Sequence, residues 1–337
     1  MISGLAAGLL LAFFMKRSRL CFAGGLRDIY MKKKLIGLKI LFIVFSLQGA
    51  IYFSLVRAGL VSAPEAKSFS LLATILGAFL FGFGAILANG CTVSMLIKAG
   101  DGRLNGFVGL LSFLLVVLSS KEGLLHDPIK ALQETTPMEN AYAATHLGLM
   151  HPIFLILAAI AIYLVILAVR KHKAPKYALP AKYTGLFHVL LEKNWMKEIS
   201  ALCIGLTAGV SFYLSEIAGR VGGWGITTPL YSWAHAFTTT EPKLSWASFF
   251  VLGIFLGGAL WGILFGEWSI KVGDARSVLF QILGGALMAF GAVLAKGCLV
   301  GFGMTGLAQG SIQGLVGIVA ICVGLWGGAA LLYMRKA

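Results

Sequence analysis

Charged residues are scarce in this chain. Only 12% of its 337 residues are Asp, Glu, Lys or Arg, whereas 58% are hydrophobic, and a soluble protein carries roughly 25% charged residues. So few charges exclude an ordinary soluble domain. The runs "LKILFIVFSLQGAIYFSLV" (38–56) and "PIFLILAAIAIYLVILAV" (152–169) contain one charge and none. Each is long enough to cross a hydrocarbon layer of about 30 Å as a helix, so we predict an all-α polytopic membrane protein.

Cysteine is also rare, and its spacing excludes several kinds of site. The five cysteines include no CxxC pair, and no histidine accompanies them at ligand spacing. This argues against a disulfide framework, a metal or iron–sulfur site and a paired redox motif. No GxxxxGK[ST] motif is present in the sequence, so ATP hydrolysis within the chain is not expected. We predict no metal, no cofactor and no catalytic residue, and we do not expect an enzyme.

Acidic residues number 13 against 28 Lys and Arg, which gives a net charge of +15. In a membrane protein such an excess collects on cytoplasmic loops, so membrane lipids and not nucleic acid are the expected neighbours. About nine transmembrane helices are predicted, over 1–15, 35–57, 69–88, 104–119, 152–170, 198–217, 246–268, 277–295 and 312–334. Most of the Lys and Arg residues fall on one face if the N-terminus lies outside and the C-terminus in the cytoplasm. We therefore predict this orientation in the cell (inner) membrane.

The two halves of the chain contain an internal repeat. "LGAFLFGFGAILANGC" (76–91) and "LGGALMAFGAVLAKGC" (283–298) are identical at ten of sixteen positions, and "GLAAG" (4–8) matches "GLTAG" (205–209). By the predicted orientation the two halves enter the membrane from opposite faces, an inverted arrangement typical of transporters. We predict one membrane domain with a first repeat at 1–151, a connecting helix and cytoplasmic linker at 152–197, and an inverted second repeat at 198–337.

Three cysteines lie where helices break. Cys91 and Cys298 close the two repeated segments, and Cys21 follows the first helix in "RLCFAGGLRD". We expect Gly90 and Gly297 to adopt the left-handed backbone that ends a helix, so that the next cysteine projects from the break. The polar, Gly-rich stretches after Cys91 and Cys298 are predicted to be re-entrant segments of irregular backbone, which membrane proteins tolerate only inside protein or beside a wet cavity.

Thiols at these breaks favour a soft solute. A thiol is soft and polarizable and a weak hydrogen-bonding group, which suits a sulfur-containing anion better than sulfate. Lys296 is interpreted either as attracting that anion or as reaching lipid headgroups, and Asn89 occupies its equivalent repeat position. Cys203 and Cys322 lie in unbroken apolar runs and are interpreted as packing residues. The candidate substrate-binding residues are Cys21, Cys91, Cys298, Gly24, Gly90, Gly297, Asn89 and Lys296.

At these residues the sequence resembles the YeeE/YedE family of sulfur-transport membrane proteins. The resemblance covers essentially the whole chain and includes "RLCFAGGLRD", "LANGC", "GRVGGWGIT" and "LAKGC". It implies an hourglass-shaped helical body that takes up thiosulfate. It also implies that Cys21, Cys91 and Cys298 pass the anion along the centre through transient S–H···S contacts, and that a small cytosolic sulfur-carrier protein is a partner.

Other functions stay open on the sequence. Some members of the family are linked to selenium metabolism, and "GGLRDIY" (24–30) is similar to that branch, so the solute could be a selenium compound. A membrane thiol enzyme that oxidises or cleaves its ligand is an alternative from a different class. A docking platform for a sulfur carrier, built on the Lys-rich segment 170–197, is a third.

Overall fold

The computed structural model describes residues 1–63, 68–139, 147–171, 193–238 and 244–333. All nine predicted helices are present, with ends close to those expected. They are α1 (Ile2–Arg17), α3 (Ile36–Arg57), α4 (Leu71–Leu87), α6 (Leu104–Glu122), α8 (Leu147–Lys171), α9 (Lys197–Ile217), α11 (Trp246–Leu264), α12 (Ala275–Leu294) and α13 (Ile312–Tyr333). Within these ranges eight helical spans are long and apolar enough to cross a membrane, and α1, with 16 residues, is shorter.

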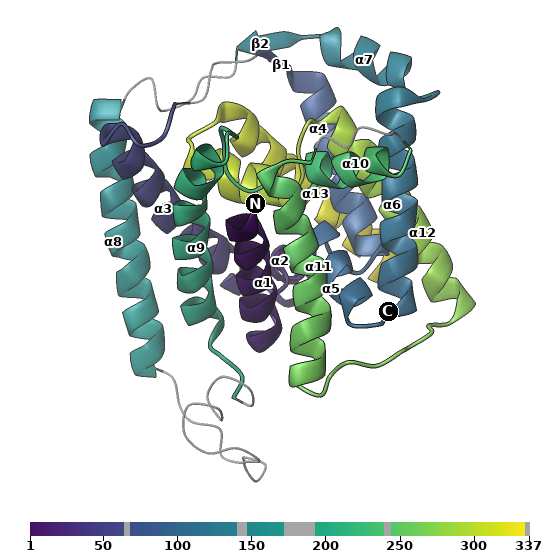
Figure 1. Ribbon diagram of the computed structural model, residues 1–337, viewed down its shortest axis with the longest axis horizontal. Coiled ribbons are helices and arrows are strands. Elements are labelled where there is room, and N and C mark those ends of the chain that lie inside the picture. Colours follow the sequence, from purple (N-terminus) through teal and green to yellow (C-terminus); the bar gives the residue numbers. More distant parts are fainter. Residues whose placement is uncertain (64–67, 140–146, 172–192, 239–243, 334–337) are drawn as a thin grey trace.

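Large apolar side chains lie on the outside of this bundle. Leu115, Ile156 and Val319 are each more than half exposed, at 62%, 61% and 57%. Water would penalise such surfaces, whereas lipid tails do not. The fold is therefore that of an all-α polytopic membrane protein, and Figure 1 shows α8 at one edge of the bundle with α1 and α11 near its middle.

Short elements connect the long helices. They are α2 (Phe22–Lys32), α5 (Thr92–Gly100), α7 (His126–Glu134), α10 (Thr227–Ala236), the π-helix η3 (Gly301–Gly306) and the antiparallel strands β1 (Ser68–Ser70) and β2 (Pro137–Glu139). The expectation of irregular backbone after Cys91 and Cys298 is thus wrong. Both segments are short helices, because a helix satisfies its own peptide groups where water is absent.

The central helices α4 and α12 cross at four glycines. A Cβ on Gly77 would lie 2.6 Å from the carbonyl oxygen of Gly291, and a Cβ on Gly84 would lie 2.8 Å from that of Gly284. Only glycine permits such close backbone approach. In the sequence repeat Gly77 corresponds to Gly284 and Gly84 to Gly291. Gly77 therefore contacts the repeat equivalent of Gly84, and Gly84 contacts the repeat equivalent of Gly77. This reciprocity is what a two-fold relation between the segments requires, and it supports the predicted repeat.

Other helix pairs follow the same pattern. α1 packs against α11 and α9 packs against α3, while α13 packs against α4 and α12 against α6. Each pair joins one helix from the first predicted repeat to one from the second. Residues 172–192 of the predicted linker lie outside the described residues, and the repeat boundaries at 151 and 198 stay a prediction.

Candidate functional site

The three cysteines occupy similar local positions. Cys21 is the N-cap of α2, where its sulfur accepts a hydrogen bond from the backbone N–H of Gly24 at 3.3 Å. Cys91 is the N-cap of α5. Cys298 lies four residues after α12, and its carbonyl oxygen accepts from the N–H of Phe302 at 2.8 Å. Each therefore lies near the start of a helical turn, where unsatisfied N–H groups create a positive potential.

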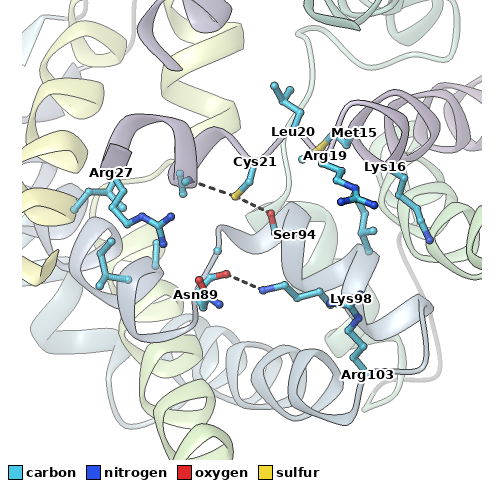
Figure 2. A pocket seen from close by; sticks show the side chains of 17 residues that line it. Met15, Lys16, Arg19, Leu20, Cys21, Arg27, Asn89, Ser94, Lys98 and Arg103 are labelled. Atoms are coloured by element: carbon cyan, nitrogen blue, oxygen red, sulfur yellow. Dashed lines mark hydrogen bonds between the residues drawn. The ribbon is translucent and has the colours of Figure 1, made fainter. Parts of the chain in front are cut away.

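Ser94 links two of the three thiols. Its hydroxyl oxygen lies 3.2 Å from the sulfur of Cys21 and 3.8 Å from the sulfur of Cys91, and Figure 2 shows it directly below Cys21. Ser94 was not among the predicted site residues. The sequence does place Ser94 three residues after the N-cap Cys91, and a side chain at that position lies beside the cap. This spacing could have identified Ser94 as a partner of Cys91.

A first cavity, of about 380 Å³, opens beside Cys21. Its described lining residues include five cations and no carboxylate. The cations are Lys16, Arg19, Arg27, Lys98 and Arg103, and the predicted residues Gly24, Asn89 and Gly90 line the same cavity. Lys98 donates a hydrogen bond to the carbonyl oxygen of Asn89 at 2.7 Å, as Figure 2 shows. The cavity thus combines a thiol with an excess of positive charge, which favours an anion.

A second cavity, of about 510 Å³, contains Cys298. It is lined by Lys121, Lys130 and Lys296 and, among the described residues, by no carboxylate. The two cavities use corresponding positions of the repeat. Ala85, Ile86, Asn89, Gly90 and Ser94 line the first, and their counterparts Ala292, Val293, Lys296, Gly297 and Gly301 line the second.

The two cavities lie at opposite ends of α6. Arg103, the N-cap of α6, lines the first cavity, and Lys121, in the last turn of α6, lines the second. At 1.5 Å per residue these positions are about 27 Å apart along the helix, close to the thickness of a hydrocarbon layer. Each cavity is therefore positioned to serve a different face of a membrane.

The left-handed backbone at the two breaks belongs to different residues from those predicted. Asn89 (φ 49°) and Lys296 (φ 56°) adopt it, Gly90 has φ 153°, and Gly297 is not among the residues with positive φ. The expectation for Gly297 is wrong, because the left-handed residue at that break is Lys296. Gly297 serves close packing instead. A Cβ on Gly297 would lie 2.5 Å from the Phe302 ring, and one on Gly90 would lie 2.9 Å from the Cβ of Ser94.

The predicted residues fall into two groups. Cys21 and Cys91 meet through Ser94, and Gly24, Asn89 and Gly90 line the cavity beside them. Cys298, Gly297 and Lys296 line the second cavity. Cys91 is only 2% exposed and Cys298 only 3%. All five cysteines are free thiols.

A helical membrane bundle with a thiol-bearing basic cavity at each end defines a protein suited to soft anions. Comparison with known proteins agrees with this class. The chain belongs to the sulphur-transport family, whose model matches residues 17–327. It is 34% identical to the thiosulfate transporter TsuA of Escherichia coli over 99% of this chain and 95% of that protein. It is 27% identical to the thiosulfate transporter TsuA of Spirochaeta thermophila over 99% of each chain.

Proposed function

We propose that the chain takes up thiosulfate across the inner membrane. The observation that carries this proposal is the pair of basic cavities, each containing a thiol from a helix break. The names of two full-length relatives, both thiosulfate transporters, support the choice of solute. The positive linings suit a dianion, and polarizable thiols suit its terminal sulfur.

The proposed path runs through the three cysteines. With the N-terminus outside, the second cavity receives the anion and presents it to Cys298. Cys91 and then Cys21 accept it in turn through transient S–H···S contacts, and the first cavity releases it to the cytoplasm. Support comes from the Ser94 bridge, which brings Cys21 and Cys91 within reach of a common group. No covalent bond forms or breaks in this relay, because the anion moves intact.

Uptake by purified protein in liposomes tests this function. Thiosulfate labelled on both sulfurs should accumulate above empty liposomes and be recovered intact from the lumen. Cys91→Ala and Cys298→Ala should each reduce uptake by at least tenfold, whereas Cys203→Ala, which changes a packing thiol, should leave it within about twofold. Uptake equal to empty liposomes rejects the proposal. Normal uptake by both site variants rejects the relay while leaving transport intact.

The same assay separates the other candidate functions. Stronger competition by a selenium compound than by unlabelled thiosulfate would assign the protein to selenium uptake. Recovery of cleaved or oxidised label would indicate a thiol enzyme. A small cytosolic sulfur carrier remains a proposed partner, and its docking segment 170–197 lies largely outside the described residues. Deletion of that segment without loss of uptake would argue against a docking platform.

A further inference from the structure

A buried ion pair lies beside the first cavity. Lys16, in the last turn of α1, pairs with Asp101, which follows α5, and their side chains are only 4% and 7% exposed. The same ammonium lies 3.4 Å from the carbonyl oxygen of Gly258 and 3.9 Å from the carboxylate of Glu267. Removing two charges from water costs free energy, and charges buried within membrane proteins usually serve substrate or ion movement.

Lys16 is shared between two cavities. It lines the first cavity together with Cys21, and it lines a neighbouring cavity together with Asp101 and Glu267, which we name the carboxylate cavity. In Figure 2 the Lys16 side chain runs away from Cys21, so its ammonium is turned from the thiol. The cation is thus held by a carboxylate while its stem forms part of the wall of the anion cavity.

We propose that Asp101 is a proton-binding site coupled to anion binding in the first cavity. This inference rests on the proposed function. A proton on Asp101 removes the nearer, buried carboxylate that holds Lys16 and leaves only the more exposed carboxylate of Glu267, 3.9 Å away. The ammonium can then help to stabilise an anion beside Cys21. Each binding event favours the other, as linkage requires. Proton and anion then move together, and the proton offsets part of the opposition that an inside-negative potential imposes on a dianion.

The other charges around Asp101 also favour anion binding when Asp101 is protonated. Lys16 faces it from α1, Arg103 from the start of α6 and Glu267 from the segment after α11. Arg19 and Lys271 line the same carboxylate cavity. Protonation of Asp101 therefore leaves the cluster with a larger cationic excess next to the substrate cavity. Glu267, whose side chain is 44% exposed, is screened by water and contributes less than the buried Asp101.

A purely structural role makes a different prediction. In that case the pair only anchors α1 to α5, and breaking it lowers stability and uptake together without changing proton movement. The discriminating quantity is therefore the number of protons that enter with each thiosulfate, and not the uptake rate alone.

The experiment uses the full chain in liposomes that contain a pH-sensitive dye. The membrane potential is clamped at zero with potassium and valinomycin, and an inward thiosulfate gradient is imposed at equal pH. The wild-type protein should acidify the lumen as thiosulfate enters. Conversely, a pH one unit lower outside should accumulate thiosulfate roughly tenfold if one proton accompanies each anion.

Asp101→Asn should let thiosulfate equilibrate without acidification or accumulation. Glu198→Gln is the matched control, because it breaks the Lys39–Glu198 pair at 3.2 Å between α3 and α9, and it should couple as the wild type does. If Asp101→Asn does not reconstitute, Asp101→Glu takes its place. That variant should keep coupling but shift the pH at which coupling is half-maximal, and an unshifted midpoint overturns the assignment.

Three results overturn the inference: the unshifted Asp101→Glu midpoint and the two that follow here. One further result overturns only the proposed function on which the inference rests. Wild-type thiosulfate influx without acidification shows that protons are not coupled. Acidification by Asp101→Asn equal to that of the wild type shows that the proton site is elsewhere. The absence of any wild-type thiosulfate entry rejects the proposed function itself, and it is distinguished from the three overturning results by the lack of label in the lumen.

Discussion

At the scale of single residues, Ser94 is a polar group that Cys21 and Cys91 share. Its hydroxyl contacts both sulfurs, at 3.2 and 3.8 Å, so Ser94→Ala should leave both thiols without their shared partner. Loss of one such hydrogen bond costs about 1 kcal/mol, which corresponds to about a fivefold reduction in uptake efficiency. Initial rates of thiosulfate uptake in liposomes measure this change.

A matched control keeps this prediction specific. Ser46→Ala removes another buried hydroxyl, from α3, that lines neither of the two thiol cavities, and it should transport at the wild-type rate. Ser94→Ala uptake that is indistinguishable from that of Ser46→Ala would show that the bridge has no role in transport.

The location of the cysteines at helix breaks was predictable from the sequence, whereas the contact with Ser94 was not. A Gly-Cys break repeated in both halves marks Cys91 and Cys298, but nothing in the spacing brings Ser94 toward Cys21, which lies 73 positions away. The sequence also suggests the left-handed conformation for Gly90 and Gly297, which is one position too late at each break. Glycine usually takes that conformation, but here Asn89 and Lys296 adopt it, and Gly90 and Gly297 are positions where a Cβ would crowd Ser94 and Phe302.

At the scale of secondary-structure elements, the α4–α12 crossing depends on the absence of side chains. Gly84→Ala would place a Cβ 2.8 Å from the backbone oxygen of Gly284, so the helices must separate. Overpacking of this kind costs about 1–3 kcal/mol. Thermal unfolding in detergent should therefore show a lower midpoint for Gly84→Ala. Gly327→Ala on α13, whose nearest contact is 3.9 Å away, should unfold at or above the wild-type temperature. Equal midpoints would contradict the tight crossing.

Long helices were easier to predict than short ones. Runs such as 38–56 and 152–169 are continuous and apolar, and lipid requires such runs to be helical. The short helices α5 and η3 contain glycine and polar residues that are typical of loops. For α5 the helical form follows from burial: eight of its nine residues are buried, and buried peptide groups need partners. Tertiary packing, and not local composition, therefore determines that this short segment is helical.

At the scale of the whole molecule, the two thiol cavities lie at opposite ends of α6, so the cysteines should be reached from opposite faces. Cys21 lines the first cavity and Cys298 the second. A membrane-impermeant, anionic thiosulfonate reagent should modify Cys298 from the outer face and Cys21 from the cytoplasmic face. Variants that retain one of these two cysteines, in a background that also lacks Cys91, Cys203 and Cys322, isolate each reaction.

The charge of the two cavities adds a second requirement to this labelling experiment. Cationic linings should attract the anionic reagent and repel a cationic reagent of similar size, by a factor that falls as salt is raised. We therefore expect faster modification by the anionic reagent at both cysteines, with the preference reduced in high salt. Modification of Cys21 and Cys298 from the same face would contradict the arrangement of cavities on which the proposed direction of uptake depends. An equal rate for both reagents would remove the electrostatic reason for anion entry.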